Sequence, residues 1–148
     1  MRHFVLPDVQ AKPGVDFKYL TAIGNYIAEK RPDKIICLGD FADMPSLSSY
    51  DVGKKAYEGR RYLADVQSAI DAMESLMRPI IELQERQHNN RKKIYNPEFI
   101  MLLGNHENRI NRAINNDAKL DGLISTDDLK YKEWGWTVHP FLERVIID

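Results

Sequence analysis

The sequence predicts a single α/β domain in which helices cover a parallel sheet. Three short apolar runs occur without polar alternation, which indicates strands that are buried on both faces. Segments with helical apolar spacing separate these runs. The chain has 148 residues, of which 43% are hydrophobic and 29% charged, as in an ordinary globular domain. We therefore expect one domain over residues 1–148.

The first two runs are predicted to form a βαβ unit. The run "HFVLP" at 3–7 is the first strand, and "KIICL" at 34–38 is the second. Pro32 ends the helix between them, because proline cannot continue a helical hydrogen-bond ladder. Apolar residues at helical spacing mark this helix, namely Phe17, Leu20, Ile23, Tyr26 and Ile27.

A second helical crossover leads to the third strand. Apolar residues recur at helical spacing from Leu63 to Leu83, and "FIMLL" at 99–103 follows as the third strand. Pro79 lies within the helical pattern. It either kinks one long helix or occupies the first turn of a second helix.

Polar clusters follow all three strands. They are Asp8-Val9-Gln10, then residues 39–43 ("GDFAD"), then residues 104–107 ("GNHE"). Each cluster alone could be an ordinary turn, since Gly-Asp after a strand is a common turn signal. The carboxyl ends of parallel strands meet at one edge of a sheet, however, so the three clusters together predict a shared site.

The predicted side chains are oxygen donors suited to metal ions used in hydrolysis. Carboxylate and amide oxygens with no thiolate favour Mn, Mg, Fe or Zn in a catalytic role over a structural zinc site. Asp40, on the central strand, is the best residue to bridge two ions. Two ions about 3.5 to 4 Å apart stabilise an in-line displacement at phosphorus. The predicted donors are Asp8, Gln10, Asp40 and Asn105.

The motifs "DVQ", "GDFAD" and "GNHE", in this order, resemble the calcineurin-like metallophosphoesterases over residues 1 to 115. The resemblance implies an αββα sandwich of two sheets. It also implies hydrolysis of phosphomonoesters or phosphodiesters by attack of a hydroxide that bridges two divalent ions, manganese foremost. Asp8 and Gln10 would bind the first ion, Asp40 would bridge, and Asn105 would bind the second.

The same resemblance assigns roles to neighbouring residues. His106 would protonate the leaving alkoxide or stabilise charge on the phosphoryl group. Asp43 and Glu107 would orient the ligands. Arg109 follows the third motif and is predicted either to hold a substrate phosphate or to lie on a helix surface.

Two features depart from the family pattern. Gln10 stands where most members have histidine, and an amide oxygen is a weaker donor than imidazole to a borderline ion. The later histidine motifs are absent, and only His139 follows Glu107. We therefore expect an incomplete domain that contains the first sheet and the start of the second, with "GWTVH" and "ERVII" as its first strands. An exposed second sheet would favour self-association.

The remaining features bear on partners and location. Basic residues in 46–62 are predicted either to meet a phosphate backbone or to be solvated. A formal net charge of −1 neither requires nor excludes nucleic acid. Cys37 cannot form an intrachain disulfide and is expected in the core, which favours the cytoplasm. No apolar stretch approaches a membrane span. The basic residues are Lys54, Lys55, Arg60 and Arg61.

A second hypothesis is a catalytically weak or silent binding module, for nucleic acid among other ligands, that keeps the scaffold with an incomplete metal site. A dinucleotide-binding module is disfavoured, because no GxGxxG motif follows the first strand.

Overall fold

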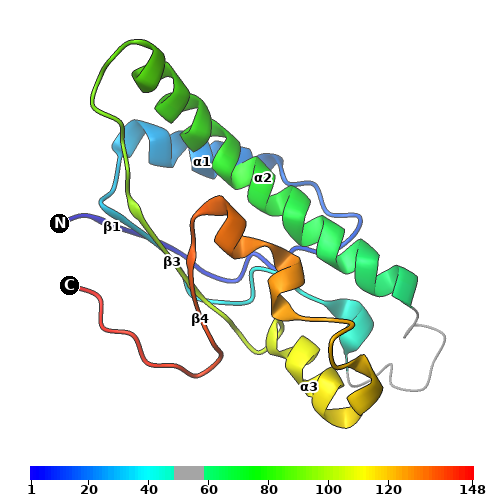
Figure 1. Cartoon of the computed structure of the whole chain (residues 1–148). Helices are drawn as coiled ribbons and strands as arrows, with labels where there is room; N and C mark the ends of the chain where they lie inside the picture. Colours follow the sequence, from blue (N-terminus) through cyan, green and yellow to red (C-terminus); the bar gives the residue numbers. More distant parts are fainter. Residues whose placement is uncertain (49–58) are drawn as a thin grey trace.

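A computed structural model, which describes residues 1–48 and 59–148, contains one sheet of four parallel strands (Figure 1). Adjacent strands in the sheet are also consecutive in the chain. The α/β class and the parallel sheet predicted from the sequence are confirmed. The strands are β1 (His3–Leu6), β2 (Lys34–Cys37), β3 (Glu98–Leu102) and β4 (Thr137–His139).

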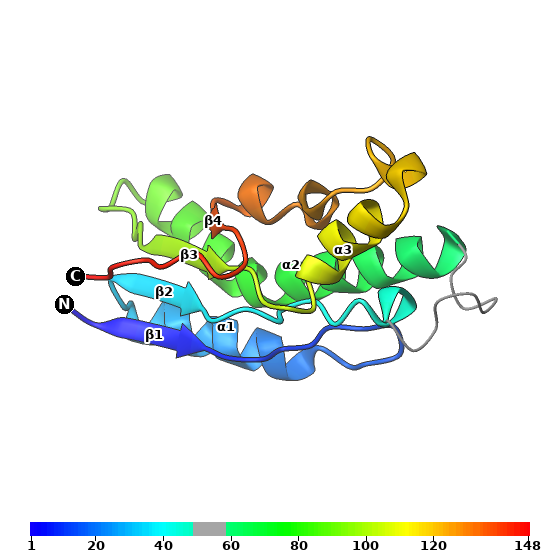
Figure 2. The same ribbon diagram turned by 90° about the horizontal axis from the view of Figure 1, so that it is seen from below.

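The register aligns the carboxyl ends of the first three strands. Leu6 lies opposite Cys37, and Cys37 lies opposite Met101, so β1, β2 and β3 end in one row. The arrowheads of β1 and β2 point to the same end of the molecule in Figure 2. The three polar clusters therefore leave the sheet side by side, as the sequence predicted.

Two helices cover one face of the sheet. Helix α1 (Lys18–Lys30) and helix α2 (Gly59–Asn89) lie on the same side of it in Figures 1 and 2. They approach closely at Gly24, where an added Cβ would lie 2.3 Å from the Leu76 carbonyl oxygen. Pro79 lies inside α2, so the crossover is one long helix and not two.

The hydrophobic core lies between the sheet and these helices. Alternate strand residues face the helices, and Cys37 is among them, so the predicted core thiol is confirmed. Buried side chains of the strands are Leu6, Ile35, Cys37, Phe99 and Met101, and buried side chains of the helices include Leu20, Ile27, Ala69, Met73, Leu76 and Ile80.

The opposite face of the sheet is only partly covered. Val5 and Leu38 are 47% and 53% exposed, whereas Ile36 is buried. Residues 140–148 lie on this side, away from the two helices (Figures 1 and 2). The imidazole Nε2 of His3 lies 3.0 Å from the carbonyl oxygen of Asp148, which places the end of this segment near β1.

The expected second sheet does not begin where the sequence suggested. Thr137–His139 is a strand, but it pairs in parallel with β3 and extends the first sheet. The predicted strand "ERVII" at 143–147 has no strand structure. The prediction failed because strand pairing depends on register between distant residues, which a short apolar run does not specify.

Short helices connect β3 to β4. Helix α3 (Asn108–Asn116) starts directly after the "GNHE" cluster. The 3-10 helices η4 (Ala118–Leu120), η5 (Thr126–Leu129) and η6 (Tyr131–Trp134) follow it. A further 3-10 helix, η1 (Pro45–Leu47), lies after β2. In the described parts of the chain, no helix has the length and apolarity needed to cross a membrane.

Candidate metal and phosphoester site

The segments that follow β1 and β2 are joined by backbone hydrogen bonds. The Gln10 N–H donates to the Asp40 carbonyl over 2.8 Å, and the Ala11 N–H donates to the Phe41 carbonyl over 2.7 Å. The Asp43 N–H returns a bond of 3.0 Å to the Ala11 carbonyl. The pairing of β1 with β2 thus continues past the strand ends and fixes the first two polar clusters against each other.

Asp40 also binds the third cluster. Its Oδ1 accepts a hydrogen bond of 2.9 Å from the His106 N–H. The turns pack so closely that a Cβ on Gly104 would lie 2.2 Å from this Oδ1. A Cβ on Gly39, whose φ is +100°, would lie 2.8 Å from the Gly104 nitrogen. Glycine is therefore required at both positions, because any side chain would separate Asp40 from the third cluster.

Three of the four predicted metal ligands have a left-handed backbone. The φ angles are 33° at Asp8, 51° at Gln10 and 51° at Asp40. Such conformations cost a non-glycine residue on the order of 1 to 3 kcal/mol and are concentrated at functional sites. The strain coincides with the residues that sequence reasoning selected for their donor atoms.

The predicted donor atoms are free to bind a ligand. Asp8, Gln10 and Asn105 are exposed, and their side chains form no hydrogen bond with another described residue. Asp40 is half-buried and uses only Oδ1. Burial is the main cause that raises the pKa of the Cys37 thiol to about 12, and the charges of Glu107, Asp8 and Asp40 contribute to this rise.

This donor set fits a hard divalent ion by its chemistry. Within the described residues, no three His, Cys, Asp or Glu side chains are grouped to hold a metal ion by themselves. The predicted donor set contains only two residues of these types, Asp8 and Asp40, because Gln10 and Asn105 are amides. Carboxylate and carbonyl oxygens are the ligands preferred by Mg and Mn.

His106 is held in place by Asp43. The imidazole Nδ1 lies 2.8 Å from Asp43 Oδ1 and 2.9 Å from the Asp43 carbonyl oxygen. Both side chains are largely buried, with 18% and 14% exposed. Because Nδ1 donates to Asp43, the Nε2 atom is left for proton transfer, and it has no partner among the described residues.

Glu107 is a fully buried carboxyl group beneath the site. Its Oε1 accepts a hydrogen bond of 3.2 Å from the Phe41 N–H, whereas Oε2 has no partner among the described residues. Burial foremost, together with the charge of Asp40, raises the pKa of Glu107 to about 8. Glu107 thus fixes the backbone of the residue after Asp40, and its role in orienting a metal ligand stays a prediction.

Arg109 contacts the protein backbone. Its Nη1 donates to the Asp43 carbonyl over 3.0 Å and to the Met44 carbonyl over 3.4 Å. Met44 has a φ of 52°, so this bond supports a strained turn after the second cluster. Sequence reasoning considered substrate and surface roles for Arg109 and missed this one, because the partners are more than 60 residues away in the chain.

His139 is engaged away from the predicted donors. Its Nδ1 lies 3.0 Å from Glu143 Oε1, and its carbonyl accepts the Leu103 N–H over 2.9 Å.

The basic segment 46–62 is described only in part. Lys54, Lys55 and the side chain of Arg60 lie outside the described residues. Arg61 is exposed and lines a hollow of about 300 Å³ together with Lys12 and Asp65.

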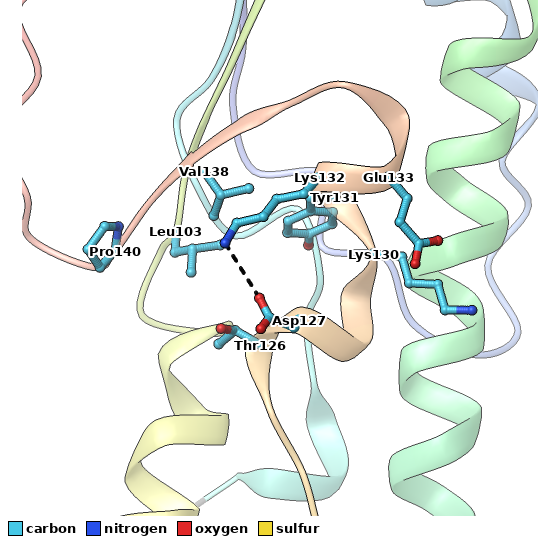
Figure 3. A pocket seen from close by; sticks show the side chains of 9 residues that line it. All are labelled: Leu103, Thr126, Asp127, Lys130, Tyr131, Lys132, Glu133, Val138 and Pro140. Carbon is cyan, nitrogen blue, oxygen red and sulfur yellow. Dashed lines mark ion pairs between the residues drawn. The ribbon is translucent and has the colours of Figure 1, made fainter. Parts of the chain in front are cut away.

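A further hollow of about 340 Å³ lies beside the ends of β3 and β4 (Figure 3). Lys132 reaches across it toward Asp127, with Nζ 3.7 Å from Oδ1. Tyr131 lines the hollow and packs edge-on against Phe41, with ring centroids 5.7 Å apart. Burial and the charge of Glu107 raise the pKa of Tyr131. No sequence motif indicated Tyr131, whose ring packs against Phe41, the residue after Asp40.

Comparison of the chain with protein-family models, with curated proteins and with solved structures finds no match.

Proposed function

We propose that the chain is a metal-dependent phosphoester hydrolase with the calcineurin-like metallophosphoesterase fold. One observation carries the proposal: Asp40 is bonded to both of the other polar clusters. Its carbonyl accepts the Gln10 N–H, and its carboxylate accepts the His106 N–H. A bridging ligand requires this central position.

Four residues would hold the ions. Asp8 and Gln10 lie after β1, Asp40 after β2, and Asn105 after β3, and all four offer oxygen. When bound, two divalent ions would supply an activated water and neutralise the phosphoryl oxygens. We propose manganese as the metal. All four donors are oxygens, and Gln10 supplies an amide oxygen in place of an imidazole, which suits Mn better than Zn.

His106 supplies the proton for the leaving group. Nδ1 keeps its proton throughout and donates it in a hydrogen bond to Asp43, whose carboxylate stabilises the imidazolium. As hydroxide forms a bond to phosphorus, the bond between phosphorus and the leaving oxygen breaks. That oxygen takes the Nε2 proton and departs as an alcohol, which leaves a neutral imidazole.

Arg109 and Glu107 act through the backbone. Arg109 holds the Asp43 carbonyl, and Glu107 holds the Phe41 N–H, so both fix the loop that carries Asp40 and Asp43.

A cytoplasmic location remains part of the proposal and rests on the buried, unpaired Cys37. Self-association also remains a prediction, but the exposed second sheet no longer supports it, because Thr137–His139 extends the first sheet.

The test is turnover of p-nitrophenyl phosphate, bis-p-nitrophenyl phosphate and DNA with added manganese. We expect metal-dependent hydrolysis that is lost in Asp40→Asn. The matched control is Asp127→Asn, which removes an exposed carboxylate paired with Lys132. Manganese binding with no turnover of any substrate would contradict the hydrolase and favour the hypothesis of a silent binding module.

A further inference from the structure

The amino end of the sheet carries a hollow of about 400 Å³ that the proposed site does not use. Arg31 and Asp33 line it from the turn before β2, and Lys93 and Tyr95 line it from the segment before β3. The predicted metal ligands follow the carboxyl ends of the same strands. The two places therefore lie at opposite ends of the sheet.

Positive charge is concentrated around this hollow. Five exposed cations lie in the segments that precede β1, β2 and β3, and two of them, Arg31 and Lys93, line the hollow together with the carboxylate Asp33. Of the other carboxylates near this end of the sheet, Glu98 is paired with Lys34, and Asp148 lies beside His3. Within the described residues, none of the five is in an ion pair. We call them the amino-end cations: Arg2, Arg31, Arg91, Lys92 and Lys93.

The backbone beneath these cations is held by specific hydrogen bonds. Gln87 Oε1 accepts the Tyr95 N–H over 2.7 Å, and Gln84 Nε2 donates to the Tyr95 carbonyl over 2.9 Å. The Tyr95 hydroxyl donates to the Pro32 carbonyl over 2.6 Å, which joins the two loops. The cations therefore project from a fixed framework, so little backbone entropy is lost when they bind a ligand.

Arg2 and Arg31 are also fixed relative to each other. The Arg2 guanidinium donates to the Arg31 carbonyl over 3.1 Å, and the Arg2 N–H donates to Asp33 Oδ2 over 2.7 Å. The Asp33 carboxylate is thus engaged by the backbone. Guanidinium groups bind phosphate through paired N–H donors, so this region offers phosphate recognition beyond net charge.

We propose that the amino-end cations form a docking surface for the phosphate backbone of nucleic acid. A small phosphate ester would meet only one or two of these cations, whereas a linear polyanion can contact all five. Asn89, Asn90 and Asn96 are exposed beside them and can bond to sugar and base edges. An anionic membrane fits less well, because stable interfacial binding also needs a broad apolar face.

The test is fluorescence anisotropy with a labelled single-stranded DNA of about 20 nucleotides, a length that exceeds one ordinary single-strand site. The full chain is used in EDTA, so that binding is measured without hydrolysis. The variant is Arg31→Gln, Lys92→Gln, Lys93→Gln. We expect about tenfold weaker binding or more, and a salt slope reduced by about 2, since each single-strand phosphate contact contributes about 0.7.

The matched control removes the same charge elsewhere, with Lys18→Gln, Arg78→Gln, Lys119→Gln. Its affinity should stay within about twofold of wild type, because these cations lie outside the surface. Circular dichroism checks that both variants fold. Equal loss in both variants, or no DNA binding by the wild type, would overturn the proposal.

Two further probes distinguish nucleic acid from an acidic peptide and from an anionic membrane. Polyglutamate and phosphatidylserine vesicles should bind more weakly than DNA at equal salt, and tighter binding to either would overturn the assignment to nucleic acid. If the chain binds DNA but hydrolyses none of the three substrates with manganese, the result would contradict the proposed hydrolase and still support this docking surface.

Discussion

The His106 N–H donates to Asp40 Oδ1 over 2.9 Å, although the two residues are 66 positions apart in the chain. This bond connects the central polar cluster to the turn that carries Asn105 and His106. The geometry of the site therefore depends on how closely two strand-end turns can approach.

Replacement of Gly104 by alanine should disrupt this approach. The new Cβ would lie 2.2 Å from Asp40 Oδ1 and 2.5 Å from the Asp40 nitrogen, so the backbone would have to move. We expect the free energy of unfolding to fall by on the order of 3 kcal/mol, as for severe overpacking. Urea unfolding followed by tryptophan fluorescence measures this change.

Gly122→Ala is the matched control. Gly122, unlike Gly104, has a positive φ of +82°, and an added Cβ there meets nothing within 4 Å. Its cost should be about 1 kcal/mol, from backbone strain alone. Equal stability of the two alanine variants would show that the turns do not pack as described.

His106→Ala should lower turnover by roughly 10² to 10⁴, the usual contribution of a positioned acid. The effect should be smaller with p-nitrophenol, a good leaving group that needs less protonation. Manganese affinity, measured by calorimetric titration, should stay near wild type. His88→Ala, an exposed change on α2, is the control. Parallel loss of metal and activity would make His106 a ligand and not an acid.

Glu107 should make stability depend on pH. Its folded pKa of about 8 exceeds the ordinary value of 4.5, so the folded chain binds the proton more tightly. The stabilisation is present below about pH 4.5, and it is lost as pH rises toward 8, by up to about 1.4 kcal/mol per unit. Urea unfolding in EDTA should therefore show lower stability at pH 8 than at pH 5.

Glu107→Gln removes this titration while keeping an oxygen for the Phe41 N–H. The variant should lose less stability than wild type between these pH values. Identical pH dependence in the two proteins would mean that Glu107 is already ionised in the folded chain.

Gly24→Ala should destabilise the chain even though alanine favours helices. The Cβ would lie 2.3 Å from the Leu76 carbonyl oxygen and 3.0 Å from Pro79 Cγ. Separation of α1 from α2 should cost about 1 to 3 kcal/mol, more than the gain of about 1 kcal/mol in helix propensity. Thermal unfolding should show a lower midpoint, and an unchanged or higher one would rule out the close contact.

The parallel sheet and the position of its polar clusters were predictable because they depend on local patterns. Continuous apolar runs marked β1, β2 and β3 within about two residues, and the rule that ligands lie at strand ends brought Asp8, Asp40 and Asn105 together. Their chemistry required only residue type and order.

The remaining structure depends on distant pairing. The parallel register of β4 with β3 and the contact of Arg109 with the Asp43 carbonyl both join residues more than 30 positions apart. The left-handed φ of Gln10 also has no sequence signal, because glutamine rarely adopts it. Tertiary contacts impose these features, so no local pattern predicts them.

The most direct test of the central claim is anomalous diffraction from crystals soaked in manganese. Metal peaks should lie within about 2.0 to 2.3 Å of side-chain oxygens of Asp8, Gln10, Asp40 and Asn105, the range for small divalent ions. Asp40 should contact both peaks. Manganese peaks at other residues, with these four side chains unliganded, would contradict the account.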